Sequence, residues 1–401
     1  MDFEVIKRLK KPADTKIVML VMDGLGGLPG DSGRGTELEV ARTPHLDALA
    51  AKSVCGLHQP VAAGITPGSG PAHLALFGYD PLRYEVGRGV LAALGIGFDL
   101  QSGDVAARGN FCTLDAQGRV SDRRAGRIAT ETCAELCDKL RGIAVEGVRL
   151  FVEPVKEYRF LLVLRGEGLN GDIADTDPQQ VGAEPLAPQA RDRQARATAE
   201  KVRRFLEAAR DVLADEHPAN MALLRGFSQR PLWPTMPEVF GLRPAAVAGY
   251  PMYRGVSRLI GMTILETGAT LPEEIETLEK HWADHDFFYV HVKKIDSAGE
   301  DGDFERKVAL IADVDQHVPR LLDLQPDVLV VTGDHSTPSA LQSHSWHPVP
   351  VLLHSRTCRP DPVDRFGERA CTNGGLGPNF PAKDLMVLAL ANAGRLAKFG
   401  A

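Results

Sequence analysis

IVMLVMD, residues 17–23, is an apolar run that ends in an aspartate, and the chain repeats this pattern at FFYVHVKKID, residues 287–296, and VLVVTGD, residues 328–334. Near-continuous apolar runs of this length are typical of strands that are buried on both faces of a parallel sheet. Open α/β sheets place their chemistry beyond the carboxyl ends of such strands. The three runs therefore predict an α/β fold with a mostly parallel sheet sandwiched by helices, in which the three terminal aspartates lie side by side.

The three aspartates are Asp23, Asp296 and Asp334, and two histidines accompany the last of them. His335 follows Asp334 directly, and His344 precedes the next apolar run, PVPVLL. Ionised carboxylates that are buried together cost considerable free energy unless cations neutralise them. Oxygen and imidazole ligands without a thiolate suit Mn²⁺, Mg²⁺ or Zn²⁺. We therefore expect these five residues to bind metal, although an isolated aspartate in such a position is more often a helix cap or a turn residue.

Ser69, in GITPGSGP at residues 64–71, is the candidate nucleophile. The following sequence, AHLALFGYDP, predicts a helix that begins at Ser69 or just after it, so a phosphoryl group or an ionised serine oxygen would be stabilised at the helix N-terminus. A simple helix cap is the alternative role of this serine. Pro67 occupies the position of the first glycine in GxSxG, which disfavours a serine hydrolase. His73 lies one helical turn further and is expected to support or pack beside the site.

The composition is that of an ordinary globular protein. The chain has 401 residues, 44% apolar and 25% charged, with a formal net charge of −7, and this length exceeds one typical compact core. The acidic balance and the lack of a stripe of basic residues argue against a nucleic-acid partner. The sequence contains neither a signal-peptide pattern nor a membrane-length apolar run, which predicts a cytoplasmic protein without a membrane partner. Six dispersed cysteines predict free thiols.

A change of character divides the chain into two domains. From residue 104 to residue 181, shorter strand-like and turn-like pieces predict a smaller inserted α+β domain, which leaves residues 1–103 and 182–401 as a discontinuous catalytic domain. The charged, helix-like stretch QARDRQARATAEKVRRFLEAARDVL is expected to belong to the catalytic domain. The main sheet is expected to resume at the strand-like stretch ANMALLRG.

Arginines gather in two short motifs of the inserted segment, ARGN and DRRAGR. The planar guanidinium group binds phosphate and carboxylate through paired hydrogen bonds. A single arginine is more often a surface charge, but the motifs together predict an anion pocket that faces the metals. With two further arginines one helical turn apart, the expected substrate-binding residues are Arg108, Asn110, Arg123, Arg124, Arg127, Arg254 and Arg258.

These motifs resemble those of the archaeal-type 2,3-bisphosphoglycerate-independent phosphoglycerate mutases, members of the alkaline phosphatase superfamily. The resemblance runs nearly end to end and is carried by VMDGLGG, ARTPHLDALA, GITPGSGPAHLALFGYDP, ARGNF, DRRAGR, GYPMYRG, HVKKIDSAGEDGDFE and VTGDHSTP. It implies an alkaline-phosphatase-like α/β domain that is interrupted by a smaller domain, with two divalent cations between them.

The resemblance also implies a role for each candidate residue. Ser69 would be the phosphorylated nucleophile in the interconversion of 3-phosphoglycerate and 2-phosphoglycerate, a step of glycolysis and gluconeogenesis. Two divalent cations would be the cofactors, and no bisphosphoglycerate would be required. One cation would bind Asp23, Ser69, Asp334 and His335, and the other would bind Asp296 and His344.

Glu300, four residues after Asp296, stands where members of this family commonly have a metal-binding histidine. Glutamate binds Mn²⁺ or Mg²⁺ and adds a negative charge, so we expect Glu300 to be a ligand and the metal preference to change. Ligand motifs do not distinguish a mutase from a phosphohydrolase. A metal-dependent phosphotransferase or phosphohydrolase acting on another small phosphorylated acid is therefore the alternative, and a catalytically silent metal-binding scaffold is a third reading.

Overall fold

The computed structural model describes residues 2–30 and 33–400, which form two compact units. One unit comprises Met1–Glu85 and Trp233–Ala401, and the other is the inserted segment Val86–Leu232. The inserted unit is wider at both ends than the predicted residues 104–181. Each unit has a sheet and an apolar core of its own.

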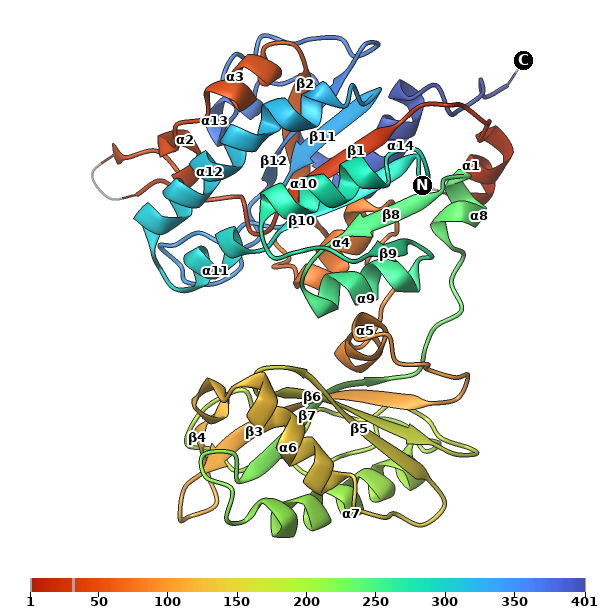
Figure 1. The fold of residues 1–401 in the computed structure, drawn as a ribbon, viewed down its shortest axis with the longest axis vertical. Helices are drawn as coiled ribbons and strands as arrows, with labels where there is room; N and C mark the ends of the chain where they lie inside the picture. Colours follow the sequence, from red (N-terminus) through yellow and green to blue (C-terminus); the bar gives the residue numbers. More distant parts are fainter. Residues whose placement is uncertain (1, 31–32, 401) are drawn as a thin grey trace. The chain divides into compact units, whose positions relative to one another are not determined.

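An eight-stranded sheet forms the centre of the larger unit (Figure 1). Its strand β1, Ile17–Met22, is buried along its whole length and pairs in parallel with β10, Phe287–Val292, and β11, Val328–Thr332. Burial on both faces explains the continuous apolar sequence of these strands. The predicted α/β fold with a mostly parallel sheet is confirmed. The remaining strands, in the order β13-β2-β12-β11-β1-β10-β8-β9, are β2 (Val54–Gln59), β8 (Pro244–Val247), β9 (Thr263–Leu265), β12 (Val349–Ser355) and β13 (Gly377–Pro381).

Strand β12 runs against the direction of its neighbours. It pairs antiparallel with both β11 and β2, whereas the other neighbouring pairs of this sheet are parallel. An antiparallel strand begins at the edge where its neighbour ends. The connection between β11 and β12, which carries His335 and His344, therefore begins and ends at the carboxyl edge of β11.

Helices cover both faces of this sheet (Figure 1). On one face, α3, α10, α12 and α13 pack around a core that includes Leu20 and Phe288. On the other face, His73 of α4 and Phe77, the C-cap residue of that helix, contact the ring of Tyr289. The helices of this unit are α1 (Phe3–Leu9), α2 (Glu37–Val40), α3 (Pro44–Ala50), α4 (Ser69–Leu76), α8 (Met236–Phe240), α9 (Pro251–Leu259), α10 (Leu271–Lys280), α11 (Lys294–Glu300), α12 (Phe304–Asp323), α13 (Glu368–Cys371), α14 (Leu385–Asn392) and the 3₁₀-helix η3 (Ala382–Asp384). Among residues 2–30 and 33–400, every helix is too short or too polar for a membrane span.

Glu274 on α10 is a carboxyl group that the core holds in its neutral form. The residue is 5% exposed. Burial raises the pKa of Glu274 to about 9, and the adjacent charge of Glu273 adds to the rise. Because the folded-state pKa lies above the unfolded value, this group favours the fold below the unfolded pKa of about 4.5, and that contribution is lost as the pH rises through about 9.

The variant Glu274→Gln replaces the neutral acid with an amide that does not ionise. Its free energy of unfolding, measured in urea, is therefore expected to rise relative to wild type between about pH 5 and about pH 9, by roughly 1 kcal/mol or more. Glu276→Gln is the matched control, because Glu276 is exposed on the same helix. An identical pH dependence for wild type and Glu274→Gln would contradict the prediction.

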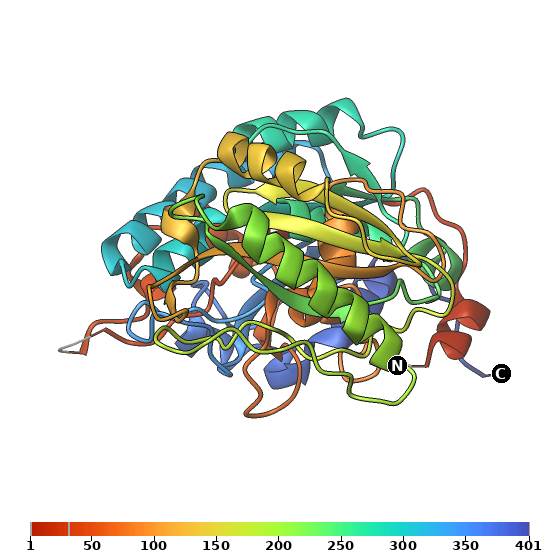
Figure 2. The ribbon, with the colours of Figure 1, turned by 90° about the horizontal axis from the view of Figure 1, so that it is seen from below.

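The inserted unit contains a five-stranded antiparallel sheet, with helices packed on it (Figure 2). Helices α6 and α7 share one apolar core with this sheet, and Figure 2 shows α7 running across the strands. The elements are α5 (Arg88–Gly95), β3 (Val105–Leu114), β4 (Val120–Asp122), η2 (Ala125–Arg127), α6 (Thr130–Leu140), β5 (Arg149–Lys156), β6 (Arg159–Arg165), α7 (Arg196–Leu213) and β7 (Met221–Ser228).

The expectation that ANMALLRG returns to the main sheet is wrong. This stretch forms most of β7, which pairs antiparallel with β3 and places Arg225 opposite Arg108. The preceding helix α7 contributes Val202 and Phe205 to the core of the inserted unit. An apolar strand sequence indicates burial but does not specify the neighbouring strand, so the boundary at residues 181–182 could not be corrected from the pattern alone.

Candidate active site

The predicted metal ligands lie together at the carboxyl edge of β1 and β11. Asp23 directly follows β1, and Asp334 and His335 follow β11. Asp296 does not end a strand as predicted, because β10 stops at Val292 and Asp296 lies in the first turn of α11. All four ligand candidates are buried. The predicted proximity therefore holds, although a helix supplies one of the carboxylates.

Asp23, Asp334 and His335 form a first group, whose ligand atoms lie within 4.8 Å of one another. His335 Nε2 lies 3.4 Å from Asp23 Oδ1 and 3.2 Å from Asp334 Oδ2. Within the described residues, the buried Asp23 Oδ1 accepts no hydrogen bond. A buried carboxylate oxygen without a donor is costly, and a divalent cation between these atoms would remove that cost. The first group therefore has the chemistry of a site for Mn²⁺, Mg²⁺ or Zn²⁺.

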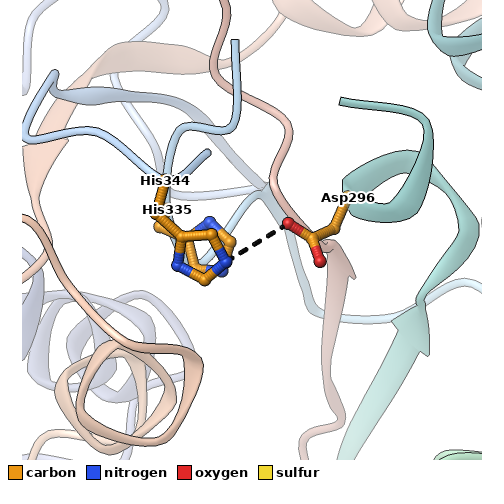
Figure 3. Close-up of side chains that lie close together, drawn as sticks. All are labelled: Asp296, His335 and His344. Carbon is orange, nitrogen blue, oxygen red and sulfur yellow. Dashed lines mark ion pairs between the residues drawn. The ribbon is translucent and has the colours of Figure 1, made fainter. Parts of the chain in front are cut away.

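Asp296, His335 and His344 form a second group on the same distance criterion (Figure 3). His344 Nε2 lies 3.5 Å from Asp296 Oδ1, and the rings of His335 and His344 stack with their centroids 3.7 Å apart. His335 belongs to both groups and joins them. Glu300 lies at the margin, with Oε1 3.9 Å from His344 Nε2 and a side chain that is 53% exposed.

Ser69 is the first residue of α4, as predicted. Its Oγ lies 3.3 Å from His335 Nε2, so the hydroxyl is adjacent to the first group. The residue is partly exposed, whereas the carboxylates beside it are buried. The helix N-terminus favours negative charge at this position, which suits both an ionised hydroxyl and a phosphoryl group.

Three donors surround the other oxygen of Asp23. Oδ2 accepts a short hydrogen bond from the hydroxyl of Tyr253, and it lies 3.2 Å from both His291 Nε2 and Lys293 Nζ. Burial alone would raise the pKa of Asp23, but the charge of Lys293 and the bond from His291 outweigh it and hold the pKa well below its ordinary value. Lys293 also contacts Asp296. Asp23 is therefore ionised, with Oδ2 occupied and Oδ1 available.

The environment of His335 keeps its imidazole neutral. Burial is the main cause that lowers its pKa, although Asp334 opposes the shift. The pKa of Asp334 is lowered on balance, because His335 and His73 outweigh the raising effects of burial and of Asp23. A neutral imidazole beside ionised carboxylates is the protonation state in which these side chains bind metal.

A buried lysine from α12 holds the two ligand-bearing loops together. Lys307 Nζ donates to the carbonyl oxygens of Gly26 and Thr337, at 3.0 and 2.8 Å, and lies 3.7 Å from the buried carboxylate of Glu37. Thr337 in turn lies within hydrogen-bond distance of the active-site ligands, donating from Oγ1 to Asp296 at 2.7 Å. The loop after β1 and the loop after β11 are thus fixed by one ammonium group.

Several of these supporting residues could not be assigned a role from sequence. Tyr253, His291 and Lys293 lie within the quoted motifs GYPMYRG and HVKKIDSAGEDGDFE, and Lys307 lies just beyond the latter, but nothing in these stretches distinguishes the four from core or surface residues. The one available signal is the spacing of Lys293 and Asp296, which places them one helical turn apart at the start of α11.

Five of the seven predicted substrate-binding residues lie in the inserted unit. Arg108 and Asn110 are on β3, with Arg225 of β7 opposite Arg108. Arg123 donates from Nε and Nη2 to the two carboxylate oxygens of Asp177, at 3.0 and 2.7 Å. The same carboxylate lies 3.5 Å from Arg225 Nη1. Arg225, which the sequence motifs did not identify, is therefore tied to the predicted arginines through Asp177.

The other four predicted substrate-binding arginines are Arg124, Arg127, Arg254 and Arg258. Arg124 and Arg127 are exposed in the turn after β4. Arg254 and Arg258 lie one turn apart on α9 in the larger unit, as predicted, and both are partly buried. Arg254 forms an ion pair with Glu266.

Comparisons with known proteins identify one family. The family model described as 2,3-bisphosphoglycerate-independent phosphoglycerate mutase matches residues 50–220. A relative from Aquifex aeolicus, named a "probable 2,3-bisphosphoglycerate-independent phosphoglycerate mutase", is 50% identical over 99% of this chain and 100% of its own length. A relative of the same name from Thermus thermophilus is 50% identical over 100% of this chain and 99% of its own.

Two solved structures are similar to this chain over nearly its whole length. The PH0037 protein from Pyrococcus horikoshii has a TM-score of 0.84 and 28% identity, covering 98% of this chain and 100% of its own. The cofactor-independent phosphoglycerate mutase from Thermoplasma acidophilum has a TM-score of 0.67 and 30% identity, covering 94% of this chain and 100% of its own. The chain belongs to the 2,3-bisphosphoglycerate-independent phosphoglycerate mutase family and is an isomerase.

Proposed function

We propose that this protein interconverts 3-phosphoglycerate and 2-phosphoglycerate through a phosphoserine at Ser69, at a centre of two divalent cations and without bisphosphoglycerate. The names of its relatives support the reaction, which belongs to glycolysis and gluconeogenesis and would take place in the cytoplasm. The observation that carries the metal-dependent mechanism is Asp23 Oδ1, a buried carboxylate oxygen without a donor in the described residues, facing His335 beside the Ser69 hydroxyl.

The candidate ligands divide between the two cations. The first group, with Ser69, would hold one cation, and Asp296 and His344 of the second group, with Glu300, would hold the other. His335 lies within reach of both groups, and its shorter contacts are to the first. When bound, the cations would lower the pKa of the Ser69 hydroxyl and withdraw charge from the phosphoryl oxygens. The complete proposed ligand set is Asp23, Ser69, Asp334 and His335 for one cation, and Asp296, Glu300 and His344 for the other.

The proposed phosphoryl transfer has two steps, one to Ser69 and one back to glycerate. The Ser69 hydroxyl loses its proton, Oγ forms the bond to phosphorus, and the bond from phosphorus to the 3-oxygen of the substrate breaks as that oxygen takes a proton. Glycerate is retained by the arginine set and turns within the site. Its 2-hydroxyl then loses a proton and attacks the phosphoserine, which releases 2-phosphoglycerate and restores the Ser69 hydroxyl.

The arginine set would bind the carboxylate and phosphate groups of the substrate. It comprises Arg108, Asn110, Arg123, Arg124, Arg127, Arg254 and Arg258, and we add Arg225 because it shares Asp177 with Arg123. Arginine suits this task because its fork matches both anions.

Removal and return of metal is the experiment that tests the proposal. Protein treated with EDTA and dialysed is expected to convert no 3-phosphoglycerate, and addition of Mn²⁺ should restore formation of 2-phosphoglycerate without added bisphosphoglycerate. Both 2-phosphoglycerate and free phosphate are measured in the same sample. Free phosphate as the sole product would instead identify a phosphohydrolase, and no product with Mn²⁺, Mg²⁺ or Zn²⁺ would contradict a catalytic role with this substrate.

Glu300 is expected to set the preference of the second cation. A carboxylate in this position favours Mn²⁺ and Mg²⁺ over Zn²⁺ relative to an imidazole. The variant Glu300→His should therefore increase affinity for Zn²⁺ relative to Mn²⁺ by roughly tenfold or more, measured by competition titration of the metal-free protein. Glu305→His, at an exposed residue on α12, is the control. An unchanged ratio of the two affinities would remove Glu300 from the ligand set.

A further inference from the structure

Three buried rings, His73, Tyr253 and His291, pack together beside the first group. The ring centroids of Tyr253 and His291 are 3.7 Å apart, and that of His73 lies 4.8 Å from Tyr253 and 5.3 Å from His291. Each of the three residues is no more than 2% exposed. Tyr253 and His291 both hold Oδ2 of Asp23, as described above. The cluster is therefore buried, and two of its polar groups, those of Tyr253 and His291, are directed at the candidate ligand Asp23.

His73 connects this cluster to the nucleophile. Its Nδ1 lies 2.8 Å from the backbone carbonyl oxygen of Ser69 and 3.1 Å from Asp334 Oδ2. Both neighbours only accept hydrogen bonds, so Nδ1 must carry a proton. Contacts with the rings of Phe77 and Tyr289 fix the orientation of the imidazole. One N–H group thus faces the first turn of α4 and a carboxylate of the first group at the same time.

We propose that the ring cluster is a positioning device for the nucleophile and the first cation site, in which His73 fixes Ser69 and Asp334 relative to each other. This inference rests on the proposed function. The opposite oxygen of Asp334, Oδ1, accepts a hydrogen bond from the amide of Gly24 at 3.1 Å, whereas Oδ2 accepts none within the described residues and has His73 Nδ1 at ion-pair distance. Outer partners of this kind orient metal ligands, and their loss typically costs 10–100-fold in metal affinity or activity.

Asparagine and leucine at position 73 form a matched pair of variants. Their side chains have the same number and branching of heavy atoms, and both remove the ring, but the amide of asparagine can place a donor near the position of Nδ1. The difference between His73→Asn and His73→Leu therefore isolates the hydrogen bond from the packing. Mn²⁺ affinity of the metal-free protein is measured by calorimetry, together with kcat and KM for 3-phosphoglycerate and the midpoint of thermal unfolding.

For His73→Leu we expect a Kd for Mn²⁺ that is raised about 10–100-fold and a kcat that is lowered by a similar factor, with KM within a few-fold of wild type. His73→Asn should recover a large part of both losses. Equal Mn²⁺ affinity and equal kcat in the two variants would overturn the positioning role, since packing alone would then explain the loss. A wild-type protein that neither binds Mn²⁺ nor forms 2-phosphoglycerate would overturn the proposed function itself, which is a distinguishable result.

Tyr253→Phe provides a second test that keeps the packing of the cluster. The substitution removes only the hydroxyl that donates to Asp23, so folding is expected to be retained. The Kd for Mn²⁺ should rise by about tenfold or more. If His73→Leu does not fold, wild-type Mn²⁺ affinity in Tyr253→Phe overturns the proposal.

Discussion

Ser69→Ala is expected to lower kcat for the conversion of 3-phosphoglycerate by at least about 10³-fold, because alanine has no oxygen on which the phosphoryl group can be carried. The fold should survive the change. Ser69 begins α4, but the N-cap residue is Gly68 and no side chain caps this helix in the described structure. The conversion is measured with the Mn²⁺-loaded protein and without bisphosphoglycerate.

Detection of the phosphoserine intermediate is the decisive measurement for this variant. Wild-type protein quenched during turnover should gain the mass of one phosphoryl group on the peptide that contains Ser69, and Ser69→Ala should not. Ser102→Ala is the control, because Ser102 is exposed in the inserted unit. Turnover by Ser69→Ala within tenfold of wild type would exclude Ser69 as the nucleophile, whatever the state of the metals.

Lys307→Met is expected to lower the free energy of unfolding by about 3–5 kcal/mol, the largest loss of stability among the variants proposed for this protein. Its ammonium group is completely buried, and two carbonyl oxygens and the carboxylate of Glu37 depend on it. Methionine fills a similar volume but leaves that carboxylate without a counter-charge. Urea denaturation followed by circular dichroism measures the change.

A second substitution separates the charge from the packing at this position. In Lys307→Met/Glu37→Gln the buried carboxylate becomes an amide, which can still accept from the amide and hydroxyl of Ser339, so part of the stability should return. Lys383→Met is the control, since Lys383 pairs with Asp80 where both side chains are about one-third exposed, and the pair should contribute only about 1 kcal/mol. A loss for Lys307→Met no larger than that of Lys383→Met would contradict the role assigned to the buried ammonium.

The sheet and most of the candidate ligands could be predicted because a buried strand has a recognisable sequence pattern. A strand covered on both faces, such as β1, has apolar residues throughout, and the first charged residue marks its end. Asp23 and Asp334 are found by that rule. Asp296 is not found by that rule, since the first charged residue after β10 is Lys293 and Asp296 lies in the first turn of α11.

The remaining features depend on tertiary contacts that leave no local pattern. Nothing in the sequence of β7 specifies that it pairs with β3 rather than with the main sheet. In the same way, Tyr253 within GYPMYRG has the sequence context of a core tyrosine, and only the folded chain brings its hydroxyl to Asp23. Donors that approach a candidate ligand from distant segments therefore escape prediction, whereas a carboxylate at the end of a buried strand can be recognised in the sequence.

The reversed direction of β12 has a consequence for how this centre could be transplanted. Because β11 and β12 are adjacent and antiparallel, Asp334, His335 and His344 lie on a single connection between two paired strands. The segment from β11 through β12 is thus a contiguous hairpin that carries three of the seven candidate cation ligands. If it were grafted as one segment onto another parallel sheet, the host would have to supply counterparts of the other four candidate ligands, Asp23, Ser69, Asp296 and Glu300.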